Sequence, residues 1–276
     1  MAEPRLEAVP PEEEEEEALE EDGLKLTFTE HLEELRRRLI YSLVAITATT
    51  TAAFVFAEEI FRWLMNPVVE ALPEDSSKLV YTSALEKFFV YLKVALYAGI
   101  FLAVPFVLFQ IWRFVAPGLY RRERRIALPF VIFGTVMFVA GGAFCYYVVL
   151  PNAFRFLLEF GGAADWTTPM LTLKEQLSLV LMLELAFGVV FEIPLVIAFL
   201  ALVGLVKAST LARYRRHAIL GVTIAAAGLT PTGDPFNLAL MAVPMYLFYE
   251  VGILLAWLIG KRRGERESET ESDRVA

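Results

Sequence analysis

Two acidic residues lie inside one of the longest apolar stretches of this chain. From Gln176 to Val206 the sequence runs for 31 positions, and its only charged residues are Glu184 and Glu192. An unpartnered carboxylate is costly in apolar surroundings, so Glu192, in FGVVFEIPLV, should face protein, water or a partner helix. The alternative is a protonated glutamic acid hydrogen-bonded between helices. We assign no function to Glu184.

A second group of charged residues precedes the first apolar segment. In FTEHLEELRRRL (28–39), Glu30, Glu34 and Arg38 follow one another at i, i+4 steps and share one helical face. This spacing alone indicates an exposed helix stabilised by its own ion pairs. The later stretch FVAPGLYRRERR (114–125) places Glu123 among arginines, which is typical of a charge cluster that sets membrane topology.

The sequence contains no recognisable catalytic set. His31 and His217 are the only histidines, the pattern HExxH is absent, and GKRRGE (260–265) lacks the GxxxxGK[ST] pattern of a phosphate-binding loop. The single cysteine, Cys145, has no base near it in the sequence. We therefore expect a protein that is not an enzyme and uses no cofactor and no metal.

The elements that position these residues are long uncharged segments. Of the 276 residues 57% are hydrophobic, and uninterrupted runs of 19 to 29 uncharged residues recur. Each can cross a hydrocarbon core of about 30 Å as a helix. The sequence predicts an all-α, polytopic integral membrane protein with six transmembrane helices, at about 39–57, 86–112, 126–150, 175–203, 217–231 and 236–259. Loops are expected at 58–84, 113–125, 151–173 and 204–216.

The last two spans are expected to be short. Between His217 and the Thr230-Pro231 break lie 12 residues, Ala218–Leu229. At 1.5 Å per residue they extend about 18 Å, less than the hydrocarbon thickness. Local thinning of the bilayer on this flank follows as a prediction.

The charged residues also predict orientation and tails. Fifteen Lys and Arg fall on one side of the six spans, against three in the opposite loops, or six with the boundary lysines. The positive-inside rule places both termini in the cytoplasm. The acidic start is unlike a secretory signal. We expect a disordered acidic tail at 1–26, a transmembrane domain at 27–260 and a disordered tail at 261–276.

Several of these stretches resemble the TatC family, the receptor subunits of the twin-arginine protein translocase. The amino-terminal pattern F-x-E-H-L-E-E-L-R-x-R-L is similar to that family's signature. ALEKFFVYLKVALYAGIFLAVPFVLFQIWRFVAPGLYRRER (84–124) is similar to its second span and first cytoplasmic loop. FGVVFEIP resembles its fourth span and LTPTGDPFNLALMAVPMYLFYEVGI its end. The resemblance covers roughly residues 28–260.

The resemblance implies a receptor and core subunit in the prokaryotic cytoplasmic membrane. Such a protein binds the twin-arginine signal peptides of folded cargo at the cytoplasmic face. It assembles with TatB- and TatA-like single-span subunits and with other TatC copies, and transport is driven by the protonmotive force. The partners are these proteins and the lipid bilayer, with no nucleic acid.

The resemblance also implies roles for individual residues. Glu34 and Glu123 would receive the two arginines, because a carboxylate accepts the planar guanidinium fork bidentately and a lysine cannot reproduce this geometry. The other residues implied in the docking site are those that orient the carboxylates, Arg36, Arg38 and Arg125, and those that shape the loop, Phe114, Pro117 and Tyr120.

Four further positions match the family outside that region. Pro67 and Asp234 match residues of the outer loops, and Glu192 and Asn237 are interpreted as intramembrane polar or partner contacts. Two departures stand out. The chain reads Thr230-Pro231-Thr232-Gly233-Asp234 where the family commonly has Thr-Pro-Pro-Asp, and Asn237-Leu238 where many members have Ser-Gln.

The alternative from another functional class is a small-solute secondary transporter or channel. It predicts polar groups at the membrane midplane and broken helices in symmetry-related positions. Glu184, Glu192 and Glu250 favour it, whereas the lack of an internal repeat and the charges at the cytoplasmic rim do not. An intramembrane hydrolase lacks a nucleophile and base.

Overall fold

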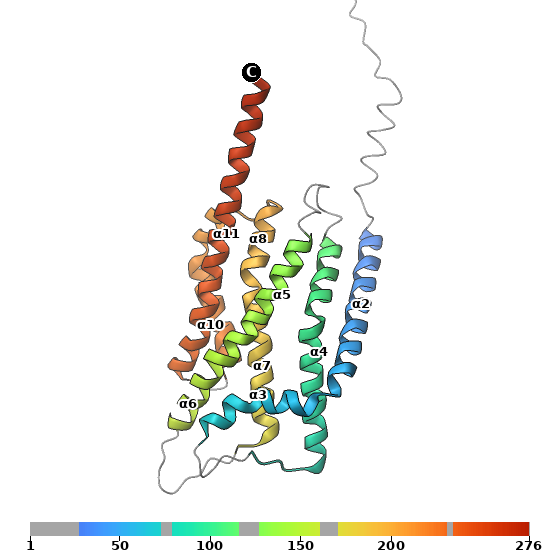
Figure 1. Cartoon of the computed structure of the whole chain (residues 1–276). Helices are drawn as coiled ribbons and strands as arrows, with labels where there is room; N and C mark the ends of the chain where they lie inside the picture. Colours follow the sequence, from blue (N-terminus) through green and yellow to red (C-terminus); the bar gives the residue numbers. More distant parts are fainter. Residues whose placement is uncertain (1–27, 73–78, 116–126, 161–170, 231–233, 276) are drawn as a thin grey trace, which may run out of the picture.

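The computed structural model describes residues 28–72, 79–115, 127–160, 171–230 and 234–275, and almost all of them are helical (Figure 1). The elements in chain order are α2 (Phe28–Phe54), α3 (Ala57–Ala71), α4 (Ala84–Val115), α5 (Ala127–Phe144), the π-helical turn η4 (Cys145–Val149), α6 (Leu150–Phe160), α7 (Leu173–Phe191), α8 (Ile193–Leu202), α9 (Ala208–Arg213), α10 (Arg215–Leu229) and α11 (Pro235–Val275).

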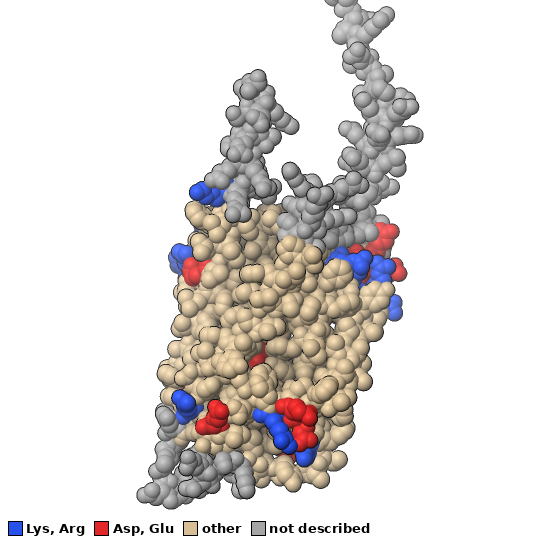
Figure 2. Space-filling model, viewed as in Figure 1, with Lys and Arg blue, Asp and Glu red and all other residues tan. Residues whose placement is uncertain are grey.

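The all-α membrane class is confirmed. In the part of the chain that the structure describes, fewer helical stretches than the six expected spans are long and apolar enough to cross a membrane. Within the described residues four helical stretches are long and apolar enough to cross a membrane, or five if the bent pair α2 and α3 is one span. Charged side chains gather toward the two ends of the molecule, and between them lies a broad band of uncharged surface that is interrupted only by a recessed acidic spot near its middle in this view (Figure 2). The N-terminal end of α2 and the C-terminal end of α11 lie at the same end of the bundle (Figure 1).

The short fifth helix agrees with the sequence, and the last helix does not. α10 has 15 residues, so its length is about 22 Å. In α11 the apolar stretch Pro235–Lys261 has 27 residues, enough to cross a membrane, so the expectation of a short last span is wrong. α11 also stays helical to Val275, where a disordered tail was expected.

The segment 58–84, expected to be a loop, contains the helix α3. It bends 88° from α2 at Val55–Phe56 and lies across the end of the bundle (Figure 1). Its inner face buries Leu64, Met65 and Val68 against α4, α6 and α7. A helix with one apolar face is stable there because that face covers the core. The expected loop 151–173 is also partly helical, since α6 continues to Phe160.

Pro67 inside α3 creates a contact that joins α3 to η4. A proline has no N–H, so the carbonyl of the residue four positions earlier, Trp63, loses its helical partner. The hydroxyl of Tyr146 donates to this carbonyl oxygen over 2.8 Å, and the two rings stack at 4.4 Å. Pro67 thus opens a backbone acceptor that a side chain of η4 satisfies.

The membrane-spanning helices approach one another closely at glycines. A Cβ on Gly141 of α5 would lie 2.5 Å from the carbonyl oxygen of Phe187 in α7, so only glycine fits that crossing. At the crossing of α2 and α4 the Thr49 hydroxyl donates to the Gly99 carbonyl over 2.8 Å. Small residues that let backbones approach are the usual means of packing helices in a membrane.

We expect Tyr146→Phe to lower the free energy of unfolding by about 1–3 kcal/mol, because the Trp63 carbonyl then stays buried without a donor. Thermal unfolding of the detergent-solubilised protein measures this. The matched control is Tyr147→Phe, whose side chain is 69% exposed and should have little effect. Equal effects of the two variants would contradict the role given to Tyr146.

Candidate binding site where helices α2 and α4 meet

Glu34 and Arg38 of α2 form an ion pair, with 2.8 Å between Arg38 Nη2 and Glu34 Oε1. The sequence predicts this pair from its i, i+4 spacing but places it on an exposed helix. In the structure the two side chains are only 12% and 10% exposed, because α4 covers them. The pair therefore lies within the contact between α2 and α4.

Gln110 of α4 completes this cluster. Arg38 Nη1 donates to Gln110 Oε1 over 3.3 Å, and both side chains are buried. Arg38 is thus held by one residue of its own helix and one of the neighbouring helix, which orients the Glu34 carboxylate. Sequence reasoning missed Gln110. The available signal was that it is the only amide in the uncharged run Val94–Trp112.

An aromatic contact joins the two helices at the same end. The ring of His31 in α2 stacks on Phe114 in α4, with 4.5 Å between the centroids. Phe114 is the last residue but one of α4, so this stack joins α2 and α4 at that end. Of the remaining residues implied in the docking site, Arg36 is exposed on α2, and Pro117, Tyr120, Glu123 and Arg125 lie outside the described residues.

Glu192 lies at a break in the fourth span. It ends α7 and begins α8, and Pro194 explains the break because proline cannot donate a helical hydrogen bond. Glu192 is half-buried, and its Oε1 has no hydrogen-bond partner among the described residues. A Cβ on Gly134 would lie 3.3 Å from its Oε2, so this carboxylate faces α5.

Glu184 faces α5 as well, but it is enclosed. Its side chain is 2% exposed, and the hydroxyl of Tyr97 donates to Oε2 over 3.0 Å. A Cβ on Gly142 would lie 3.1 Å from the same oxygen. The two acids of the fourth span thus oppose two glycines of α5 with the same spacing of eight residues, and Glu184 has a hydrogen-bond partner that the sequence did not reveal.

Asp234 and Asn237 act together at the start of α11. Asp234 Oδ1 accepts the Asn237 backbone N–H at 2.8 Å, and Oδ2 accepts the Asn237 side-chain amide at 3.0 Å. With Pro235 as first helical residue, Asp234 is an N-cap. Asn237 is 2% exposed, so in this chain the residue interpreted as a partner contact packs within its own helix start.

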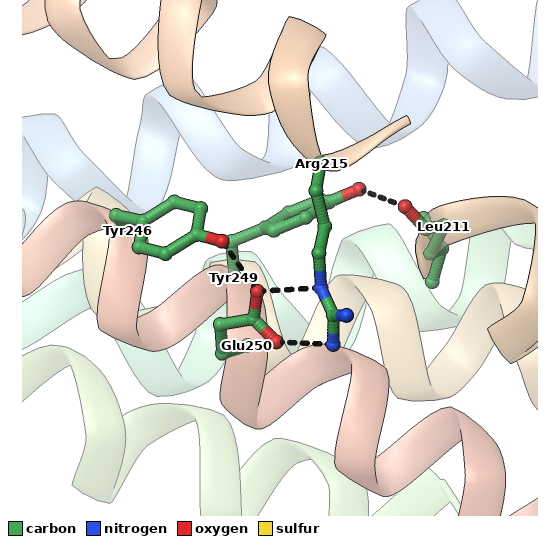
Figure 3. A network of polar contacts seen from close by, with 5 residues as sticks. All are labelled: Leu211, Arg215, Tyr246, Tyr249 and Glu250. Carbon is green, nitrogen blue, oxygen red and sulfur yellow. Dashed lines mark hydrogen bonds and ion pairs between the residues drawn. The ribbon is translucent and has the colours of Figure 1, made fainter. Parts of the chain in front are cut away.

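Glu250 belongs to a polar network that ties the short helices α9 and α10 to α11 (Figure 3). Arg215 donates bidentately to the two carboxylate oxygens over 2.8 and 2.9 Å, and the Tyr246 hydroxyl donates to Oε1 over 2.5 Å. Tyr249 donates to the carbonyl of Leu211 over 2.9 Å. Glu250 is therefore compensated by a structural ion pair.

Comparison with known proteins identifies the family. The family model "Sec-independent protein translocase protein (TatC)" matches residues 30–244. The chain belongs to the TatC family. Relatives of this chain carry the name Sec-independent protein translocase protein TatC. The protein of Koribacter versatilis is 43% identical, and the alignment covers 91% of this chain and 93% of the relative. The protein of Aquifex aeolicus is 36% identical, and the alignment covers 87% of this chain and 98% of the relative.

A solved structure supports the same assignment. The crystal structure of a twin arginine translocase receptor, TatC, superposes with a TM-score of 0.74 at 36% identity, over 83% of this chain and 99% of that one. The fold is thus that of a translocase receptor family and not of an enzyme family. These relationships give no support to the solute-transporter alternative, and the Arg215–Glu250 pair removes one of the three acids that favoured it.

We expect Glu250→Gln to lower the free energy of unfolding by about 1–2 kcal/mol, because it removes a bidentate charge-assisted contact between α10 and α11. Thermal unfolding in detergent measures the change. Glu58→Gln is the matched control. Glu58 raises the pKa of Arg62, but their side chains are 54% and 75% exposed, so solvent screens the pair and its loss should leave the melting temperature almost unchanged. A stable Glu250→Gln protein would show that the network does not hold α10.

Proposed function

We propose that this protein is the signal-peptide receptor and core subunit of a twin-arginine translocase. It binds signal peptides that carry two consecutive arginines, at the end of the bundle where α2 begins and α4 ends. The observation that carries the proposal is the Glu34 carboxylate, buried and oriented by Arg38 and Gln110 beside the entry to residues 116–126. Family membership and the receptor described for the similar crystal structure support it.

The geometry of Glu34 suits one arginine of the signal. Arg38 occupies Oε1, so an incoming guanidinium binds at Oε2 and the carboxylate lies between two cations. Glu123 receives the second arginine. By resemblance to the family, Arg36 and Arg125 orient the carboxylates and repel wrongly charged ligands, and Phe114, Pro117 and Tyr120 shape the loop. A lysine at either signal position is a point charge and lacks the planar set of N–H donors that a guanidinium presents to the carboxylate.

The membrane placement follows from the charges. Fifteen Lys and Arg fall on the side of the proposed binding site, so this side is the cytoplasmic one. The N-terminal end of α2 and the C-terminal end of α11 lie at that same end, and both termini are cytoplasmic in this arrangement (Figure 1). The six spans then comprise α2, α4, α5 with α6, α7 with α8, α10 and α11.

The protein works within an assembly and performs no catalysis. TatB- and TatA-like single-span subunits and other TatC copies are its partners, and the protonmotive force drives transport. Glu192 is the contact for a polar side chain of such a partner or of a deeply inserted signal, since it is half-buried at a helix break and its Oε1 has no partner among the described residues. Asn237 supports the cap of α11 rather than offering a free amide.

A twin-arginine peptide should bind at least about tenfold more weakly to Glu34→Gln and to Glu123→Gln, because each substitution removes a charge-assisted contact. Binding is measured by fluorescence anisotropy with the twin-lysine peptide for comparison. Glu33→Gln is the control on the same helix, since Glu33 is exposed. Undiminished and still arginine-selective binding in the double variant would remove the proposed site.

Glu192→Ala should reduce transport of a folded twin-arginine reporter much more than it reduces peptide binding. Glu192 lies within the fourth span, at the break between α7 and α8, and is not one of the residues proposed to receive the arginines. The conservative Glu192→Gln variant, which keeps a hydrogen-bonding side chain, should retain more transport. Export in cells that lack their own TatC and peptide affinity in detergent are the two readouts. Parallel loss of both would contradict separate roles for Glu192 and the rim.

A further inference from the structure

A groove of about 390 Å³ lies at the end of the bundle opposite the proposed signal site, where α4 and α7 begin. It is lined by Leu85, Phe89 and Val90, which are apolar, by Thr82, Ser83 and Glu86, and by the two basic residues Lys93 and Lys174. The proposed binding of signals and partner helices uses none of these residues.

The walls of the groove are held in place by hydrogen bonds across the chain. Glu86 accepts the N–H and the hydroxyl of Thr82 at 2.8 and 2.9 Å, and the backbone N–H of Lys174 at 3.1 Å. A parallel bridge pairs Val80 with Thr172 just before the two helices start. The starts of α4 and α7 are therefore fixed relative to each other, and the groove is preformed.

The two lysines line the groove from different helices, Lys93 from α4 and Lys174 from the first turn of α7. Lys93 Nζ donates to the hydroxyl of Ser178 over 3.0 Å, and that hydroxyl donates to the carbonyl of Lys174 over 2.8 Å. The Lys174 ammonium makes no ion pair within the described part of the chain. With Glu86 the lining carries two positive charges and one negative, a net charge of +1.

The depth of the groove in the membrane follows from the sequence. Lys93 immediately precedes the uncharged run Val94–Trp112, and Lys174 stands two residues before the apolar stretch that begins at Gln176. Helical side chains lean toward the N-terminus, so the Lys93 ammonium reaches outward, beside Phe89. Both ammonium groups then lie at the level of the lipid headgroups of the outer leaflet.

The apolar part of the lining selects a lipid over a soluble anion. Leu85 and Phe89 are 68% and 55% exposed and stand one turn apart on the same face of α4 as Lys93. A small hydrated anion would leave this apolar surface in contact with water. A phospholipid covers it with its glycerol and upper acyl chain while its phosphate meets the lysines.

We propose that this groove binds one phospholipid of the outer leaflet with a single net negative charge, its phosphodiester held between Lys93 and Lys174. The site matches the lipid in charge, since a net +1 lining receives a monoanionic headgroup. The inference depends on the proposed orientation only for the leaflet, because an inverted protein would bind the same lipid in the other leaflet. It is independent of signal binding at the opposite end.

Native mass spectrometry of the detergent-solubilised full chain tests the site with dioleoyl-phosphatidylglycerol as the probe. The double variant Lys93→Gln/Lys174→Gln should bind it about tenfold more weakly, because two charge-assisted contacts to the phosphate are lost. Lys174→Gln alone, which removes no internal side-chain contact, should lose part of the affinity and keep the wild-type melting temperature. Lys93→Arg/Lys174→Arg should bind like the wild type.

Two controls separate this site from general lipid adhesion. Lys87→Gln removes another cation of α4, which lies over the Tyr91 ring and does not line the groove, and it should leave binding unchanged. Dioleoylglycerol, which has the same acyl chains without phosphate, should bind at least about tenfold more weakly than the probe. Wild-type affinity of the double glutamine variant, or equal binding of dioleoylglycerol, overturns the proposal.

The last part of the experiment uses inorganic phosphate as a competitor. At millimolar concentration it should neither bind detectably nor displace the lipid, and displacement would show a soluble-anion site instead of a lipid site. Twin-arginine peptide affinity is measured on the same samples and should be unchanged by the lysine variants. Lipid binding without any peptide binding would reject the proposed receptor function and leave the lipid site standing.

Discussion

The low polarity of the hydrocarbon core governs this structure, because a polar group placed there is costly unless a partner within the protein satisfies it. At four sites, in the bundle and toward its ends, contacts between distant segments provide such partners. Tyr146 satisfies the carbonyl that Pro67 leaves open in α3, and Tyr97 donates to Glu184. Arg215 pairs with Glu250 across α10 and α11, and Arg38 pairs with Glu34 and Gln110 across α2 and α4.

These partnerships explain why the bundle holds together without a hydrophobic driving force between its helices, since lipid tails are as apolar as the side chains they would replace. Glycines permit the close crossings at Gly99 and Gly141, and polar contacts fix the register at which the helices meet. The 15-residue helix α10 is the clearest case, because a helix too short to match a bilayer is anchored to α11 by a bidentate ion pair, while Tyr249 of α11 holds the preceding helix α9.

The same requirement distinguishes residues that maintain the fold from residues available for function. Glu250 and Asp234 are engaged by neighbours in their own chain, and Glu184 is enclosed with Tyr97. Glu192 differs, since it is half-buried at a helix break and faces α5 without a basic partner among the described residues. At the proposed cytoplasmic end of α2, Arg38 orients the Glu34 carboxylate through Oε1, and in the proposed complex Oε2 receives the guanidinium of the signal peptide.

The sequence alone determined the all-α membrane class, the order of the apolar segments, the short α10 and the Glu34–Arg38 pair, because uncharged runs and i, i+4 spacing are local properties. It did not reveal α3, whose amphipathic pattern acquires meaning only when its apolar face covers the core. Nor could it find Gln110, Tyr97 or Arg215 as partners of charged residues, or the groove at Lys93 and Lys174. These partners and the groove depend on which helices cross and at which position along their axes. The crossings are set by glycine contacts and polar pairs between segments far apart in the chain.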